Sequence, residues 1–266
     1  GSSSAPGRRY AVIHDDSADE RGIDVAFIYD HARLRAGKTF SHVMLKRTPT
    51  RDLLQVSFTP RPSGRDLVVI GNHWPSRTRG RLETEPYRML AGETLSCRVQ
   101  RVQQALGPDV PLLAMGDFND EPFDRSLTDY ALATRHRAQV ESRRSQAPWL
   151  FNLMWPHLAQ GLGTYYHAGA PNLLDQFLAA RGLLVGPVRV LPESVQIHTA
   201  GLTKAASPAP RAFGRPADPE GVDRDGYSDH FPVALRLVDE GNQDARPARP
   251  RWRRPGTSTP PSAATT

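Results

Sequence analysis

The sequence predicts an α/β fold in which two β-sheets pack against each other and helices cover their outer faces. Short segments rich in Val, Ile and Phe recur between polar breaks from Tyr10 to Val238, which is the pattern of strands. One long segment, Glu83 to Leu106, instead repeats its apolar residues every three or four positions, as a helix does. Hairpin-like strands followed by helices fit two packed layers.

The elements follow one another along the chain as strands, a long helix, and then mixed elements. Strands are expected over Tyr10 to Ile13, Ile23 to Tyr29, Phe40 to Lys46, Leu53 to Phe58, Leu67 to Asn72, Val110 to Met115, Gly163 to Tyr166, Leu173 to Ala179 and Phe231 to Val238. Gly107-Pro108 ends the long helix. Shorter helices are expected near Arg125 to Ala133 and within Pro148 to Leu158.

The composition fits one large globular domain. The chain has 266 residues, of which 38% are hydrophobic, and this allows one sizeable core. No stretch approaches the roughly 18 uninterrupted apolar residues that a membrane span needs, so no membrane partner is expected. The single cysteine, Cys97, excludes a disulfide within the chain. The sequence indicates neither a compartment nor an oligomeric state.

The domain is expected to cover residues 1–239, and residues 240–266 are expected to form a disordered tail. The tail contains five prolines and no Leu, Ile, Val or Phe, so it cannot bury enough apolar surface to fold. Its five Arg and two acidic residues supply about half of the net charge of +6. Such a tail either attracts polyanions in a salt-sensitive way or keeps the protein soluble, and both interpretations stay open.

Three segments join an apolar run to polar side chains. Gly116-Asp117-Phe118-Asn119 follows the run Val110 to Met115, Asn72-His73-Trp74-Pro75 follows Leu67 to Ile70, and Ser228-Asp229-His230 precedes Phe231 to Val238. Each motif alone is more often a turn than a functional site. Three strand ends that carry His, Asp and Asn together predict one metal-dependent hydrolytic site.

Taken in this order, the motifs resemble the endonuclease/exonuclease/phosphatase superfamily, which has the DNase I-like fold. The resemblance extends from about Tyr10 to about Val238 and includes Arg21-Gly22-Ile23-Asp24-Val25-Ala26 and Leu173-Leu174-Asp175. It implies a two-sheet α/β sandwich and a hydrolase that cleaves phosphodiesters with Mg²⁺ or Mn²⁺. Carboxylate-rich sites without cysteine suit these hard cations.

The resemblance also implies catalytic roles for five residues. Asp117 would orient or deprotonate the attacking water, and Asn119 would hold that water and donate a hydrogen bond to the transition state. His230 would hydrogen-bond the scissile phosphate, with Asp175 fixing its tautomer and favouring its protonated form. His73 would contact the phosphate from another strand end.

Three further residues are candidates for metal or substrate binding. Asp229 would serve the metal, directly or through water. Asn72 and Arg77 are expected to bind substrate, Arg77 because it directly follows the His73 strand end. An Arg on a loop is also commonly just solvated, so this alternative stays open for Arg77.

The chain departs from the family pattern at its beginning. Family members carry a strand that ends in Asn and a strand with a metal-binding Glu, both upstream of the Arg-Gly-Ile-Asp segment. The early carboxylates here are Asp15, Asp16, Asp19 and Glu20, and we expect them in a solvated loop. The chain is therefore expected to be an N-terminally truncated member that lacks the first strands, with weakened metal binding and activity.

The substrate class is inferred from weaker signals. The Asn-His-Trp-Pro-Ser-Arg form and the basic charge favour nucleic acid, cleaved as an endonuclease or an exonuclease on DNA or RNA. The alternatives are hydrolysis of small or lipid phosphate esters, and an inactive binding module with the same fold. The sequence shows no amphipathic helix that would dock on a membrane, so it gives no support for a lipid substrate.

Overall fold

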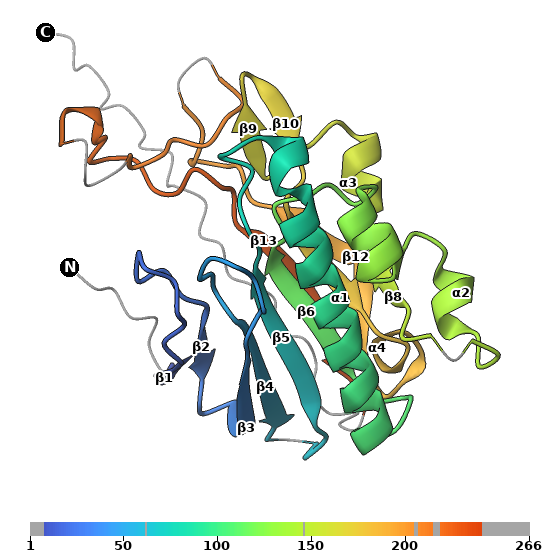
Figure 1. Cartoon of the computed structure of the whole chain (residues 1–266). Coiled ribbons are helices and arrows are strands. Elements are labelled where there is room, and N and C mark those ends of the chain that lie inside the picture. The colour runs from blue at the N-terminus through green and yellow to red at the C-terminus, as the bar shows by residue number, and fades with distance from the viewer. Residues whose placement is uncertain (1–7, 62, 146, 205–206, 215–218, 241–266) are drawn as a thin grey trace, which may run out of the picture.

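The computed structural model describes residues 8–61, 63–145, 147–204, 207–214 and 219–240. Its framework is a seven-stranded sheet with the strand order β3-β4-β5-β6-β11-β8-β7 (Figure 1). These strands are β3 (Leu34–His42), β4 (Leu53–Pro60), β5 (Leu67–His73), β6 (Leu112–Asp117), β11 (Asp175–Ala179), β8 (Leu150–Asn152) and β7 (Ala133–Thr134). The central strands β5 and β6 run parallel, because the helix α1 (Arg81–Leu106) crosses over between them.

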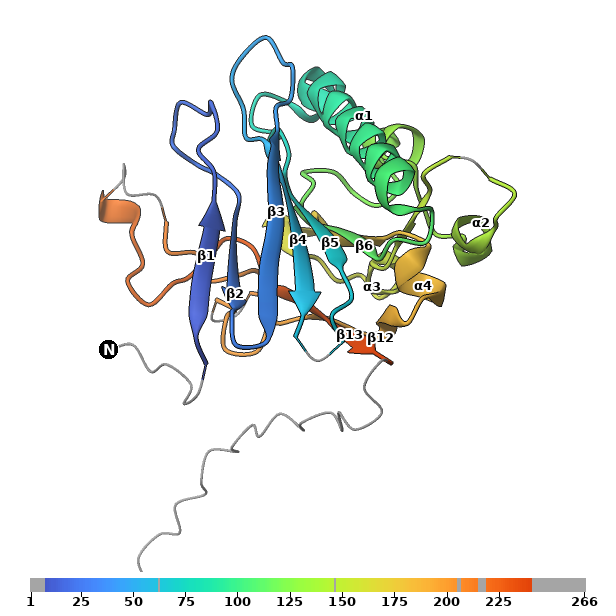
Figure 2. The same cartoon turned by 90° about the horizontal axis from the view of Figure 1, so that it is seen from below.

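A second layer covers the face of this sheet opposite α1 (Figure 2). Within the described residues it consists of two antiparallel pairs. One pair is β1 (Tyr10–His14) with β2 (Ala26–Asp30), and the other is β12 (Val188–Ile197) with β13 (Val233–Asp239). A small hairpin of β9 (Tyr165–His167) and β10 (Ala170–Asn172) precedes β11. The predicted α/β fold is confirmed.

Strand alternation divides the core into two parts. Val68 and Ile70 of β5 face α1, where they are buried with Leu95 and Val99. Residues of odd number on the same strand, such as Val69, face the second layer. Each fully buried side chain of this kind contributes about 1.5–3 kcal/mol of hydrophobic stabilisation, so both faces of the sheet hold the layers together.

Several predicted elements differ from the structure. The strand expected from Phe40 to Lys46 is β3, which begins at Leu34 and ends at His42. The helix expected near Arg125 to Ala133 is only a π-helical turn, Ser126–Tyr130, followed by β7. The segment Pro148 to Leu158 divides into β8 and the short helix α3 (Trp155–Ala159).

Besides the short strands β7, β8 and β10 and one 3-10 turn, three elements were not predicted. The strand β12 contains Pro192, Glu193 and Ser194, which interrupt its apolar pattern, and its register shifts between Leu191 and Gln196. The other two are the short helices α2 (Arg137–Glu141) and α4 (Gly182–Val185). A single 3-10 turn, Pro219–Gly221, lies in the loop before β13.

The predicted disordered tail lies outside the described residues from residue 241 onwards, so it stays a prediction. Among the helices of the described part, none combines the length and the apolar character needed to cross a membrane.

Candidate active site

Three polar residues stand in a row across neighbouring strands of the large sheet. His73 ends β5, Asp117 ends β6 and Asp175 begins β11. The strand registers pair His73 with Asp117 and Asp117 with Asp175. Register partners on strands about 4.8 Å apart project from the same face of a sheet. The side chains therefore meet, and His73 Nε2 lies 3.7 Å from Asp117 Oδ2.

A glycine allows β6 to end in this position. Gly116 has φ +132°, and a Cβ atom added to it would lie 2.0 Å from the carbonyl oxygen of Asn72 on β5. Real Cβ atoms do not approach a carbonyl oxygen so closely, and residues with a Cβ rarely adopt this φ. The glycine of the Gly-Asp-Phe-Asn motif is thus required by the close approach of β5 and β6.

The turn after Asp117 directs both of its carboxylate oxygens. The backbone N–H of Asn119 donates to Oδ1 at 2.8 Å, and Nδ2 of Asn119 donates to Oδ2 at 3.0 Å. The same Nδ2 also donates to the carbonyl oxygen of Trp74 at 3.0 Å. Asn119 has φ +51°, a left-handed conformation that Asn adopts more readily than most residues. Asn at position 119 therefore suits both the left-handed backbone of the turn and the hydrogen bonds to the Asp117 carboxylate.

The fourth member of the group, His230, comes from the second layer. It lies just before β13 and forms an isolated bridge with Tyr165, whose ring centroid lies 4.9 Å from that of the imidazole, with the two rings tilted by 33°. Its Nδ1 lies 2.7 Å from Asp175 Oδ2, which confirms the predicted contact between these two residues. The buried Thr164 fixes the backbone that carries Asp175, since its Oγ1 accepts hydrogen bonds from the N–H groups of Leu174 and Asp175.

The two histidines of the group differ in protonation. Burial by itself lowers the pKa of His230, but the hydrogen bond to Asp175 and the charges of Asp175 and Asp117 outweigh it and raise the pKa to about 9. Burial and the nearby cations Arg51 and His230 lower the pKa of His73 to about 4. At neutral pH His230 is therefore a cation and His73 is a neutral hydrogen-bonding group.

The pKa of Asp117 lies above that of an ordinary surface carboxylate. Burial, followed by the repulsion of Asp175, raises the pKa of Asp117 to about 6. An acid with this pKa is ionised at neutral pH but readily accepts a proton, which suits a general base.

A buried ion pair supports the segment that carries His73. Arg51 donates from Nε to the carbonyl oxygen of His73 at 3.2 Å and from Nη2 to that of Trp74 at 2.8 Å. Its Nη1 lies 3.2 Å from Asp19 Oδ2, and the side chains of Arg51 and Asp19 are 3% and 5% exposed. The expectation that Asp19 lies in a solvated loop is wrong. Its partner Arg51 is 32 residues away in the sequence, so no local pattern could reveal the pairing.

The predicted substrate-binding residues make internal contacts. Asn72 is buried, its Nδ2 donates to the carbonyl oxygen of Ile70 at 2.8 Å, and its Oδ1 accepts from Trp74 Nε1 at 3.0 Å. Arg77 is mostly buried and donates to the backbone carbonyl of Asn119 and to three side chains. Asp229 is exposed beside His230, and its charge helps to raise the pKa of that histidine. The roles assigned to these three residues stay predictions.

The acidic side chains of the site fit a hard divalent cation. Asp117, Asp175 and His230 offer ligand atoms that all lie within 4.8 Å of one another. His230 is protonated through its bond to Asp175, so the oxygen atoms are the available donors. A cation at Asp117 would relieve the carboxylate repulsion that raises its pKa. Mg²⁺ and Mn²⁺ prefer oxygen ligands, and Mg²⁺ commonly uses one or two carboxylates and completes its shell with water and phosphate.

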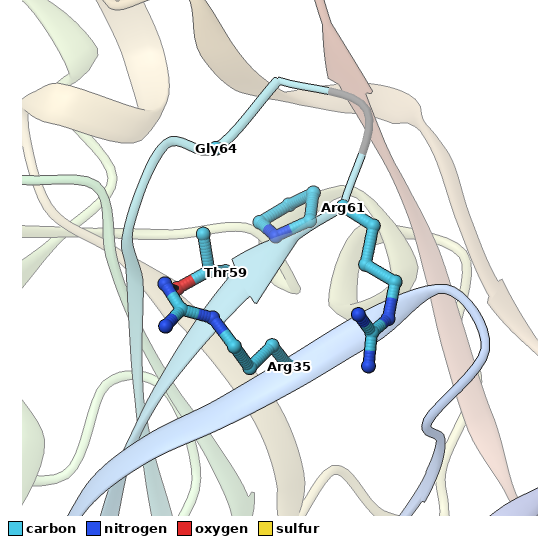
Figure 3. A pocket seen from close by; sticks show the side chains of 5 residues that line it. Arg35, Thr59, Arg61 and Gly64 are labelled. Carbon is cyan, nitrogen blue, oxygen red and sulfur yellow. Dashed lines mark hydrogen bonds between the residues drawn. The ribbon is translucent and has the colours of Figure 1, made fainter.

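A separate hollow of about 190 Å³ lies at the opposite end of the large sheet, and Arg35, Thr59, Pro60, Arg61 and Gly64 line it (Figure 3). Arg35 and Thr59 are register partners on β3 and β4, and their side chains approach to 3.5 Å. Its lining contains none of the catalytic candidates.

Solved structures with the same fold include two forms of TDP2. Humanized D. rerio TDP2 with 14 mutations has a TM-score of 0.54 and 14% identity, over 86% of this chain and 76% of that chain. Truncated Caenorhabditis elegans TDP2 has a TM-score of 0.52 and 12% identity, over 84% of this chain and 73% of that chain. The human Nocturnin catalytic domain has a TM-score of 0.47 and 16% identity, over 85% and 73% of the two chains.

No protein with curated annotation matches the sequence. A family model does match it, over residues 4–239, and its description is the Endonuclease/Exonuclease/phosphatase family. This span contains every strand of the two layers and all the residues of the candidate site. Families of this kind are hydrolytic phosphoesterases. The chain therefore belongs to the endonuclease/exonuclease/phosphatase family.

Proposed function

We propose that this protein is a divalent-metal-dependent phosphodiesterase that cleaves DNA or RNA, as an endonuclease or an exonuclease. The observation that carries the proposal is the row of His73, Asp117 and Asp175 at adjoining strand ends, with a protonated His230 bonded to Asp175. One ionised acid, one cationic histidine and one neutral histidine are thus gathered at one place.

Cleavage of a phosphodiester requires these groups for a simple electrostatic reason. The diester is anionic and repels hydroxide, so the attacking water must lose its proton as it approaches, and the growing charge on phosphorus-bound oxygens must be neutralised. Asp117 receives the proton of the water, because its carboxylate is buried and its pKa is about 6. Asn119 fixes the direction of that carboxylate through two hydrogen bonds.

The histidines act on the phosphate itself. His230 donates from Nε2 to a phosphoryl oxygen, because its Nδ1 is occupied by Asp175. Asp175 holds the ring in this orientation and keeps it protonated. His73, neutral at the pH where the others work, contributes a hydrogen bond and no charge.

Asp117 and Asp175 would offer oxygen ligands to the metal ion, Asp229 would serve it directly or through water, and substrate oxygens and water would complete its shell. When bound, the metal supplies Lewis-acid stabilisation of the phosphoryl oxygens. The net charge of +6 supports a polyanionic substrate.

The decisive experiment follows hydrolysis of the chromogenic diester bis(p-nitrophenyl) phosphate with Mg²⁺ or Mn²⁺ and with EDTA. Asp117→Asn should reduce kcat by about 10²- to 10⁴-fold, the usual contribution of a positioned base. Asp129→Asn is the matched control, because Asp129 is an exposed carboxylate that pairs with Arg125 on the surface. Undiminished turnover in a folded Asp117→Asn protein would remove Asp117 from the mechanism, and a wild type inert with both metals would favour a binding module.

A second measurement decides between nucleic acid and small phosphate esters. The affinity for duplex DNA and for single-stranded RNA is measured at low and moderate salt. Each neutralised phosphate of a duplex contributes a slope of about −0.9 in log K against log salt. A diesterase with no salt-dependent affinity for either polymer would instead act on small or lipid phosphate esters.

A further inference from the structure

We propose that Arg77 is a positioning residue, which holds the Asp117–Asn119 turn in its working geometry through the backbone carbonyl of Asn119. The proposal rests on the proposed function, because it assigns that turn a catalytic task. It gives Arg77 a different role from phosphate binding, although the residue directly follows the strand end of His73.

The guanidinium of Arg77 has little capacity left for a ligand. Nε donates to the carbonyl oxygen of Asn119 at 2.6 Å, and Nη1 donates to Asn172 Oδ1 at 3.1 Å. Nη2 donates to Asp120 Oδ1 at 3.1 Å and to Asp124 Oδ2 at 3.0 Å. Arginine has five N–H donors, and these contacts use four of them. Bidentate capture of a phosphate would therefore require the guanidinium to release its internal partners.

The partners of Arg77 are themselves fixed. Asp120 is buried, with its Oδ1 2.8 Å from Nε of the fully buried Arg88 and its Oδ2 accepting from Ser126 Oγ at 2.6 Å. Asp124 accepts from Arg81 and from the backbone N–H of Glu121. The anchor for the guanidinium is therefore built from groups that cannot turn away without leaving buried charges unpaired.

The contact with Asn119 explains why the anchor matters for chemistry. The left-handed φ of +51° at Asn119 costs energy for a non-glycine residue, although less for Asn than for most, so contacts that hold the residue favour this conformation. The side chain of Asn119 is committed to Asp117 and Trp74, so its backbone carbonyl is the group of this residue that Arg77 can hold. Arg77 holds that carbonyl through its Nε at 2.6 Å.

The fourth partner extends the effect to the other acidic residue. Asn172 ends β10, and its main-chain oxygen accepts the N–H of Thr164, whose side chain in turn fixes Asp175. One guanidinium thus braces the turn that carries Asp117 against the hairpin that leads to Asp175. We expect loss of this brace to displace both carboxylates relative to each other.

The test compares Arg77→Lys with Arg125→Lys in the full chain. Lysine keeps the charge but cannot reach four acceptors from one planar group. Arg77→Lys should lower kcat by about 10- to 100-fold on the chromogenic diester, with KM within about twofold of wild type, since a displacement of about 1 Å costs up to 10²-fold. Arg125→Lys should change neither constant, because Arg125 forms one exposed pair with Asp129. A raised KM with unchanged kcat would make Arg77 a substrate ligand and overturn the proposal.

A readout independent of activity keeps this test separate from the proposed function. The side-chain amide signals of Asn119, assigned by their loss in Asn119→Asp, are recorded by NMR in metal-free protein. They should move towards free-amide values in Arg77→Lys and remain in place in Arg125→Lys. Unmoved signals would overturn the proposal, even for a protein without hydrolytic activity. If Arg77→Lys fails to fold, Asp124→Asn removes one partner of the guanidinium and should shift the same signals in the same direction.

Discussion

His230 and Asp175 lie 55 residues apart in the sequence, yet His230 Nδ1 and Asp175 Oδ2 are 2.7 Å apart. The contact joins the second layer to the large sheet, because Asp175 begins β11 and His230 precedes β13. It also fixes the orientation of the imidazole, because Nδ1 is the ring nitrogen that contacts the carboxylate.

The pair should be visible in a titration of the metal-free protein. By NMR, the His230 ring should titrate near pH 9, because Asp175 and Asp117 raise its pKa. Asp175→Asn should lower the pKa of His230 markedly, because burial is then opposed only by the charges of Asp117 and Asp229. The folded-state pKa lies above the unfolded one, so the pair's stabilisation is complete below about pH 6.5 and is lost as pH rises through about 9. Identical titration curves for both proteins would contradict this account.

The pH dependence of kcat/KM should be bell-shaped. The proposed mechanism requires Asp117 ionised and His230 protonated, so kcat/KM should rise through a pKa at or below about 6 and fall through about 9. A cation beside Asp117 lowers the acidic limit further, because it favours the carboxylate. In Asp175→Asn the alkaline limb should move to lower pH. An alkaline limb that stays at the same pH in that variant would mean that the protonated form of His230 is not required.

Gly116 offers a test of the close approach between β5 and β6. Gly116→Ala should destabilise the fold by several kcal/mol or prevent folding, because its Cβ would lie 2.0 Å from the Asn72 carbonyl oxygen. Gly64→Ala is the control, since Gly64 also has positive φ, +68°, but no atom lies within 4 Å of its added Cβ. The free energy of unfolding of the control should fall by only about 1–2 kcal/mol, which is the cost of the left-handed conformation for a residue with a Cβ atom. The comparison is made by urea unfolding, and equal losses would rule out the steric argument.

Arg51 should contribute strongly to stability. Arg51→Met removes the guanidinium donors from the carbonyl oxygens of His73 and Trp74, and it leaves the buried carboxylate of Asp19 without this cation. The free energy of unfolding should fall by about 3–5 kcal/mol. Arg125→Met, which breaks an exposed pair, should lose at most about 1 kcal/mol. A loss below 1 kcal/mol in the free energy of unfolding of Arg51→Met would show that the Arg51–Asp19 ion pair and the two hydrogen bonds of Arg51 are dispensable.

The sequence predicted the centre of the fold better than its periphery. The apolar runs of β5 and β6 and the periodic pattern of α1 are strong local signals, because these elements are buried on a full face or on both faces. The start of β3 contains Arg35, Gly37 and Lys38, which is an exposed edge without an apolar pattern. Its strand character comes from pairing with β4, and a single segment cannot reveal pairing.

The candidate site divides in the same way. His73, Asp117 and His230 could be recognised because each adjoins an apolar strand in its own motif. The supports of these residues could not, because Arg51 reaches Asp19 and Arg77 reaches Asn172 across long stretches of chain. Ionic contacts of this kind depend on tertiary placement and leave no periodic trace in the sequence.

The row of His73, Asp117 and Asp175 has a kinetic consequence. It exists only after β5 has paired with β6 across the α1 crossover and after β11 has added to β6 from much later in the chain. Such non-local pairings form slowly, whereas α1 gains its structure from neighbours in sequence. During refolding from urea, helical signal should therefore recover before turnover does. Activity in this fold reports the completion of its most distant strand pairing, and simultaneous recovery of both signals would contradict that order.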